Sequence, residues 1–247
     1  MRFTWLRRDV ERPVGLLHPL LPLALVLVLT LQAGWHHLSS DRRGVQAEPL
    51  PLPPSTAILR GMSLGDPELL SRLLMLWLQA FDNQPGISLS YADLDYDRVE
   101  AWLAVISELD PRSQYPYLAA IRLYAQINVP EKRRQMYEFV YRAYLQAPAR
   151  RWRWLAEAAI GAKHKLGDIK LAHRYARALR EQGPADQIPG WARQMEIFLL
   201  EDLGEQASAR VLLGGLLDSG QIEDPAELLF LKQELERLDS TASNAAE

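Results

Sequence analysis

The feature that most constrains the fold of this chain is a triad of apolar residues that recurs along its second half. Each triad is spaced i, i+4, i+7, so its three side chains share one face of a helix. The copies begin at Val99, Met136, Ala172 and Ala209, at intervals of 37, 36 and 37 residues. The full set is Val99-Leu103-Ile106, Met136-Val140-Ala143, Ala172-Ala176-Leu179 and Ala209-Leu213-Leu216. A fixed interval of this size indicates stacked repeats, in which each unit buries its apolar stripe against the next.

Prolines mark the ends of these units. Pro111, Pro148 and Pro184 each stand twelve residues after the start of a triad, and Pro225 stands four residues later than that in the last copy. Because proline cannot continue a helix, we predict that each triad helix ends close before its proline. The small alanines in the triads let two helices approach each other closely.

The pattern of the remaining residues after about residue 66 also predicts helices. Asp66 before Pro67 is a helix cap followed by a proline at the first helical position, and Asp95 caps the next helix. We expect no sheet, because the alternating stretch from Ile87 to Tyr91 has no second strand as a partner. Nine helices are expected, over residues 66–81, 95–109, 113–127, 130–146, 150–166, 168–182, 189–203, 205–217 and 224–238.

The triad helix, with its small residues and closing proline, resembles the second helix of the tetratricopeptide repeat. The resemblance covers about residues 94–224. The first helix of that repeat is matched only by Trp152-x2-Leu155-Ala156-x2-Ala159, and the spacing here exceeds the usual period of about 34 residues. The resemblance implies an all-α, TPR-like right-handed α-solenoid of about four helix pairs over residues 57–239. It also implies protein binding in a concave groove lined by the first helix of each pair.

An uncharged apolar stretch precedes this region. Residues Val14 to Trp35 contain no Asp, Glu, Lys or Arg, and 22 helical residues span about 33 Å, the thickness of a bilayer core. The bases before it are Arg2, Arg7, Arg8 and Arg12. The positive-inside bias therefore predicts a cytoplasmic N-terminus (1–13), a transmembrane signal-anchor helix (14–35) and a periplasmic C-terminal domain on a bacterial inner membrane.

Two alternatives remain for this stretch. It is a cleaved signal peptide if the weak small-x-small site at Leu31-Gln32-Ala33 is used, or it is a buried core helix. Residues 36–56 are rich in proline and read as a spacer, either extended or simply disordered. We expect residues 240–247 to form a disordered tail.

No motif in the chain points to catalysis. The absence of cysteine excludes disulfides, thiolate chemistry and Cys-ligated zinc. Asp93-x-Asp95-x-Asp97 lacks the glycine and the final glutamate of a calcium loop, so we interpret it as a helix cap. His164 and His173 lack a metal-binding spacing, and Gly214-Gly215 is interpreted as a site of close helix packing. We therefore expect no enzyme activity, metal, cofactor or small-molecule substrate. Abundant carboxylates leave open an envelope hydrolase with an α-helical domain.

Charge is divided along the chain. Residues 131–180 contain thirteen Lys or Arg and four Asp or Glu, a balance of +9, whereas residues 91–111 and 181–238 carry −5 and −8. Bases interleaved with aromatic residues are also typical of single-strand nucleic-acid binding. The predicted export and the acidic ends argue against nucleic acid as a partner.

One stripe in the basic segment is the candidate binding site. Arg151, Trp154 and Lys165 share a face of the helix over 150–166. By the resemblance, this face would line a groove for an acidic or C-terminal peptide. The alternative is that the stripe packs against the preceding helix pair. We therefore expect a membrane-anchored protein–protein interaction scaffold in an envelope assembly or export system. A self-associating subunit is the alternative if apolar stripes around 69–78 or 228–235 are exposed.

Overall fold

The computed structural model describes residues 20–40, 47–184, 186–220, 222 and 224–244. Contacts divide the chain into two units. The first is made of Met1–Ala47 and Pro85–Ile87, and the second of Glu48–Gln84 and Ser88–Glu247. Helix α1 (Leu20–Ser40) belongs to the first unit, and all later helices belong to the second.

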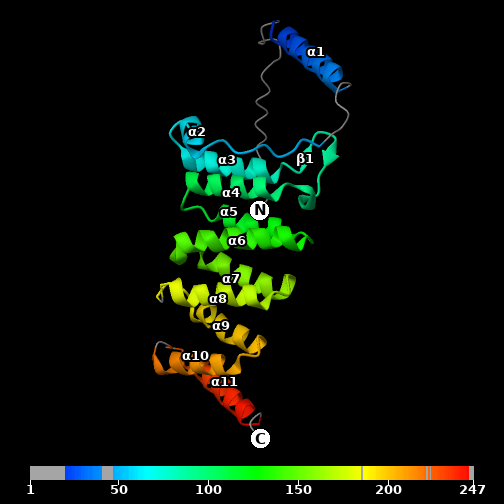
Figure 1. The fold of residues 1–247 in the computed structure, drawn as a ribbon. Coiled ribbons are helices and arrows are strands. Elements are labelled where there is room, and N and C mark those ends of the chain that lie inside the picture. The colour runs from blue at the N-terminus through cyan, green and yellow to red at the C-terminus, as the bar shows by residue number, and fades with distance from the viewer. Residues whose placement is uncertain (1–19, 41–46, 185, 221, 223, 245–247) are drawn as a thin grey trace, which may run out of the picture. The chain divides into compact units, whose positions relative to one another are not determined.

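The fold is all-α, as predicted (Figure 1). In the second unit, each helix from α2 to α11 packs against the next one in the sequence. These helices are α2 (Thr56–Met62), α3 (Pro67–Gln79), α4 (Tyr96–Leu109), α5 (Tyr115–Arg122), α6 (Pro130–Gln146), α7 (Pro148–Lys165), α8 (Ile169–Gln182), α9 (Gly190–Asp202), α10 (Gln206–Asp218) and α11 (Pro225–Asn244). Two 3-10 turns, Tyr91–Asp93 and Tyr124–Gln126, accompany them.

Local sequence signals set most helix ends. Asp66 accepts a hydrogen bond from the amide of Leu69 at 2.9 Å and starts α3, and Asp95 accepts one from the amide of Asp97 at 3.0 Å and starts α4. The cap interpretation of Asp95 is therefore confirmed. Three details of the prediction are wrong. Helix α2 was missed, the stretch Ile87–Ser88 does pair with Asn83–Gln84 as a two-stranded sheet, and α11 continues through the first five residues of the predicted tail.

The repeat register is confirmed by burial. The four triads lie on α4, α6, α8 and α10, and eleven of their twelve side chains are buried, with Leu216 half-buried. Helices α4, α6 and α8 each end two residues before Pro111, Pro148 and Pro184. Pro148 also opens α7, where its missing N–H costs no hydrogen bond. All four helices thus share an apolar face, and the first three also share a stop signal.

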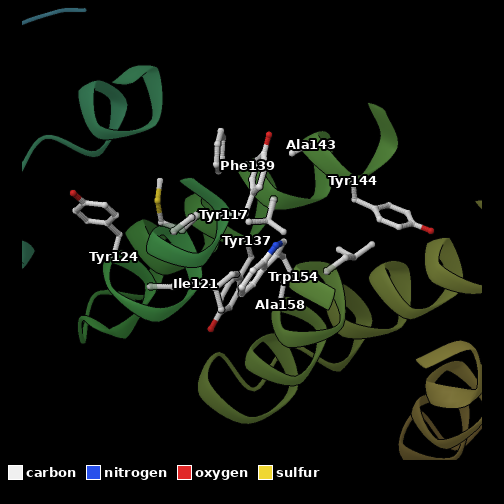
Figure 2. Close-up of a cluster of buried hydrophobic side chains, with 14 of the residues drawn as sticks. Tyr117, Ile121, Tyr124, Tyr137, Phe139, Ala143, Tyr144, Trp154 and Ala158 are labelled. Carbon is white, nitrogen blue, oxygen red and sulfur yellow. The ribbon is translucent and has the colours of Figure 1, made fainter. Parts of the chain in front are cut away.

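Buried tyrosines join elements that are not adjacent in the sequence inside the main core, part of which is drawn in Figure 2. The hydroxyl of Tyr96 donates to the carbonyl of Tyr124 at 2.7 Å, and that of Tyr144 donates to the carbonyl of Ala178 at 3.1 Å. Burial raises the pKa of Tyr144 to about 12 because the phenolate would lose its hydration. A smaller core follows at the C-terminal end, made of Ile197, Leu200, Ala209, Leu213, Leu231 and Leu238.

Part of the predicted spacer is packed against α4. Leu50 is buried, and its carbonyl accepts a hydrogen bond from Arg98 Nη1 at 2.5 Å. Trp102 Nε1 donates to the carbonyl of Pro51 at 2.7 Å. The chain from Glu48 onward is therefore held by the second unit, while residues 41–46 of the predicted spacer lie outside the described residues.

The structure describes only part of the predicted membrane span. Residues 14–19 of that span lie outside the described residues, and α1 contains the remainder. Among the helices that the structure describes, none is both long enough and apolar enough to cross a membrane.

Candidate functional site: the C-terminal groove

Two of the three predicted binding residues lie in the core. Trp154 is only 6% exposed, and its Nε1 donates to Gln114 Oε1 at 2.7 Å (Figure 2). Arg151 is equally buried; its guanidinium lies 4.6 Å from the centre of the Tyr117 ring, and Nη1 donates to the carbonyl of Ala143 at 2.6 Å. Loss of hydration lowers the pKa of Arg151.

Lys165, the third predicted residue, is exposed, and its Nζ donates to the side-chain oxygen of Gln126. The structure therefore does not bring the three residues together as a partner surface. For Arg151 and Trp154 the prediction is wrong, and the alternative of packing against the preceding helices is confirmed. The physical reason is that α7 contacts α5, α6 and α8, so both of its apolar stripes are covered.

Most basic side chains of residues 131–180 form contacts within the domain. Four arginines of this segment form ion pairs with carboxylates of other elements of the domain. These pairs are Arg134–Asp168, Arg142–Glu100, Arg174–Glu138 and Arg180–Glu196, and Arg122, before the segment, pairs with Glu157 inside it. Ion pairs on an exposed surface contribute little stability each, so their main effect here is to balance charge.

A large cavity lies further along the stack, between α8, α9, α10 and the start of α11. Its volume is about 1140 Å³. In Figure 1 these helices follow one another in the yellow-to-red part of the chain. We call this cavity the C-terminal groove. Pockets of this size accommodate ligands larger than a typical small molecule.

Seven large apolar residues line the C-terminal groove, and we call them its floor. They are Ile188, Ile197, Leu200, Val211, Leu212, Leu216 and Ile222. Val211 is 73% exposed, a high value for a large aliphatic side chain in a hollow of the surface. Gly215 on α10 leaves room above the helix backbone, whereas the Glu227 side chain fills the space beside Gly190 on α9. A Cβ at Gly214 or Gly215 would meet nothing within 4 Å, so the predicted close packing at these glycines is wrong.

The two edges of the groove carry opposite charges. Helices α8 and α9 contribute the basic edge, and the start of α10 with the start of α11 contributes the acidic edge. The basic residues are Arg177, Arg180 and Arg193, and the acidic residues are Glu205, Asp224 and Glu227. Arg177 and Arg180 also form ion pairs with Glu181 and Glu196, and the two edges together favour a ligand that carries charges of both signs.

A buried carboxylate supports the basic edge. Glu196 is 4% exposed, and Arg180 Nε lies 2.6 Å from its Oε2. His173 Nε2 lies 3.4 Å from the other oxygen. The hydrogen bond to Glu196 raises the pKa of Arg180. Glu196 thus fixes the position of a cationic side chain at the groove, because an unpaired buried carboxylate would be costly.

Sequence reasoning missed this groove. The available signal was Val211 and Leu212, two apolar residues of α10 of which Val211 lies off the buried stripe of Ala209 and Leu213. Such extra apolar positions on a repeat helix indicate a second contact face. The basic edge could not be found in this way, because charged residues on a helix are ordinarily solvated.

No protein-family model matches this chain, and no curated protein or solved structure matches it either. What the chain does is therefore inferred from the C-terminal groove and from the sequence.

Proposed function

We propose that the chain is a TPR-like, membrane-anchored scaffold whose C-terminal groove binds a segment of another protein. The observation that carries this proposal is the groove itself, a cavity of about 1140 Å³ with an apolar floor and two charged edges. An α-helix with its side chains is about 10–12 Å wide, and helix-in-groove binding uses this combination of apolar anchors and a polar rim. The partner is an amphipathic segment with both acidic and basic side chains.

A helical solenoid is the architecture that best explains the repeats. Besides the contacts between successive helices, α6 contacts α4 and α7 contacts α5. Contacts between neighbouring units only are typical of a solenoid. We assign the helix pairs as α3 with α4, α5 with α6, α7 with α8 and α9 with α10, stacked with a right-handed twist.

Anchoring is proposed from the sequence. The 22 uncharged residues from Val14 to Trp35 and the four arginines before them favour a single-pass anchor with a cytoplasmic N-terminus. The helical domain then faces the periplasm, where the partner belongs to an envelope assembly or export system.

The groove favours binding over catalysis, because it does not hold a pair of buried carboxylates among its described residues. A hydrolase would need a buried acidic pair in the cleft. Among the groove residues that the structure describes, the one buried carboxylate is Glu196, and Arg180 holds one of its oxygens at 2.6 Å. The oppositely charged edges also favour a partner of mixed charge over a purely acidic peptide.

Affinity capture of the full chain from detergent-solubilised membranes tests the proposal. We expect Val211→Asp, at the exposed groove floor, to lower recovery of a specific partner roughly tenfold, since loss of a central apolar anchor costs more than about 1 kcal/mol. Ile160→Asp is the matched control, because Ile160 is 46% exposed on α7 and does not line the groove. Equal partner recovery with both variants would contradict the proposal.

A further inference from the structure

Helix α3 has two apolar faces, and only one of them is packed. Ser71, Met75 and Leu78 are buried on the side that contacts α4. Leu69, Leu73 and Leu76 are spaced i, i+4, i+7 on the opposite side, and they are 52%, 53% and 56% exposed. The first long helix of the domain therefore presents a leucine stripe to its surroundings.

The preceding helix and turn also expose large apolar side chains. Ile58 and Met62 of α2 are 56% and 63% exposed, and Leu64 in the turn before α3 is 97% exposed. Leu64 also has a φ of 51°, a left-handed conformation that disfavours a leucine. A strained and almost fully exposed leucine indicates that its side chain contacts something other than this domain. We call these residues, with Leu69, Leu73, Leu76 and Trp77, the α2–α3 apolar face.

A terminal unit of a helical stack ordinarily has a polar outer face, because nothing follows to cover it. The α2–α3 apolar face departs from this rule. Arg72 is the one charged residue between Leu69 and Leu76, and the stem of an arginine can lie along an apolar surface while its head group stays in water. Large apolar patches on a protein surface mark contact with a protein or a membrane.

The length of the chain limits what can cover this face. Helix α1 ends at Ser40, and the second unit holds the chain from Glu48 onward, where the backbone amide of Glu48 donates to Gln84 Oε1 at 2.7 Å. The eight residue steps between Ser40 and Glu48 can span at most about 27 Å. An anchor that includes α1 would therefore keep this end of the domain close to the bilayer surface.

We infer that the α2–α3 apolar face lies on the lipid interface of the membrane that holds the anchor, and this rests on the proposed function. Amphipathic helices at this interface bury their apolar side by about 5–10 Å, and tryptophan such as Trp77 is enriched there. A fluid lipid surface accepts the protruding Leu64 without a shaped pocket, whereas a protein partner would need one. Lipid contact therefore fits this face better than a second copy of the chain.

Single-cysteine labelling of the full chain tests the inference, because the chain has no cysteine of its own. Leu73→Cys and Ile160→Cys are labelled with an environment-sensitive fluorophore and reconstituted into vesicles of phosphatidylcholine and phosphatidylglycerol. The two positions are comparably exposed, at 53% and 46%, on α3 and α7. We expect nitroxide-labelled lipids to quench the probe at residue 73 on the order of threefold more strongly than the probe at residue 160, given the interfacial depth of such helices.

Density-gradient flotation of the same samples tests the membrane anchor separately from the lipid contact of the α2–α3 apolar face. If the protein floats with the vesicles and both probes are quenched equally, the lipid contact is overturned while the anchor stands. If the unlabelled Leu73→Cys variant forms disulfides between two copies on mild oxidation in the vesicles, and the labelled variant escapes quenching, a second copy covers the face and the lipid contact is again overturned. If the protein does not float, both the anchor and the lipid contact are wrong.

Discussion

The hydroxyl group of Tyr137 occupies the space that a side chain at Gly161 would need. A Cβ added to Gly161 would overlap this hydroxyl and lie 3.2 Å from Cε1 of the ring. Tyr137 belongs to α6 and Gly161 to α7, and both are buried. Contact between these two helices therefore depends on a missing side chain, as at other close helix crossings.

Replacement of Gly161 by alanine should destabilise the domain by about 1–3 kcal/mol, because the added methyl group forces the Tyr137 ring to move. The matched control is Gly214→Ala on α10, where a Cβ meets nothing within 4 Å. There alanine should stabilise the helix by up to about 1 kcal/mol, because glycine is the poorer helix former. Chemical denaturation of the full chain in detergent measures both changes, and shifts of the same sign would contradict this contact.

The sequence predicts the helices well because caps, prolines and periodicity are local signals. Asp95 and Pro148 act on the residues beside them, and the triads report a single buried face. Trp154 shows the limit of this reasoning. A helix packed on one side has one buried face, but α7 is covered by α6 and by α8, so its second stripe is buried too. The sequence predicts at most the extra apolar residues of α10, and not the groove itself, because the groove is a space among four helices.

The repeat register makes a prediction for two alanines in equivalent positions. Ala172 on α8 and Ala209 on α10 are both fully buried. Replacing either with leucine should destabilise the domain by about 1–3 kcal/mol, because the extra atoms have no room in a packed core. Thermal melts of the two variants measure this effect. If both melt like the unchanged protein, the shared register is wrong.

Trp154 should act on stability rather than on partner binding. Trp154→Ala removes a buried ring and its hydrogen bond to Gln114, at a cost of about 3–5 kcal/mol. Trp154→Phe keeps most of the ring and should cost less, with a hydrogen-bond contribution of about 1 kcal/mol. Denaturation curves give both values. If Trp154→Ala folds with unchanged stability but no longer binds the partner, Trp154 belongs to a partner-binding surface and this prediction is wrong.

Asp168 should make the free energy of unfolding of the domain depend on pH. The amide of Leu171 donates to its carboxylate at 2.9 Å and Arg134 lies beside it, and these contacts hold the pKa of Asp168 below its ordinary value. The stabilising contribution is therefore complete above the unfolded pKa of about 3.9 and is lost as the pH falls through the lower folded value.

Asp168→Ala should cost about 1 kcal/mol near neutral pH, as expected for the loss of a helix cap. The difference from the unchanged protein should shrink as the pH falls below about 4. Asp168→Asn is the control, since it keeps a cap oxygen but cannot ionise. Urea denaturation across this pH range follows the difference, and a constant difference between the unchanged protein and Asp168→Ala would show that the ionised carboxylate contributes nothing.

The most direct test of the central proposal is site-specific photo-crosslinking in intact cells. A photoreactive amino acid is placed at Val211 in the C-terminal groove or at Ile160 on α7, both in the full chain and both exposed. We expect ultraviolet light to give a discrete adduct with another protein from residue 211 and none from residue 160. The Arg193→Glu substitution should weaken that adduct by reversing charge at the basic edge. If residue 211 gives no adduct, or the same adducts as residue 160, the C-terminal groove is not a protein-binding site.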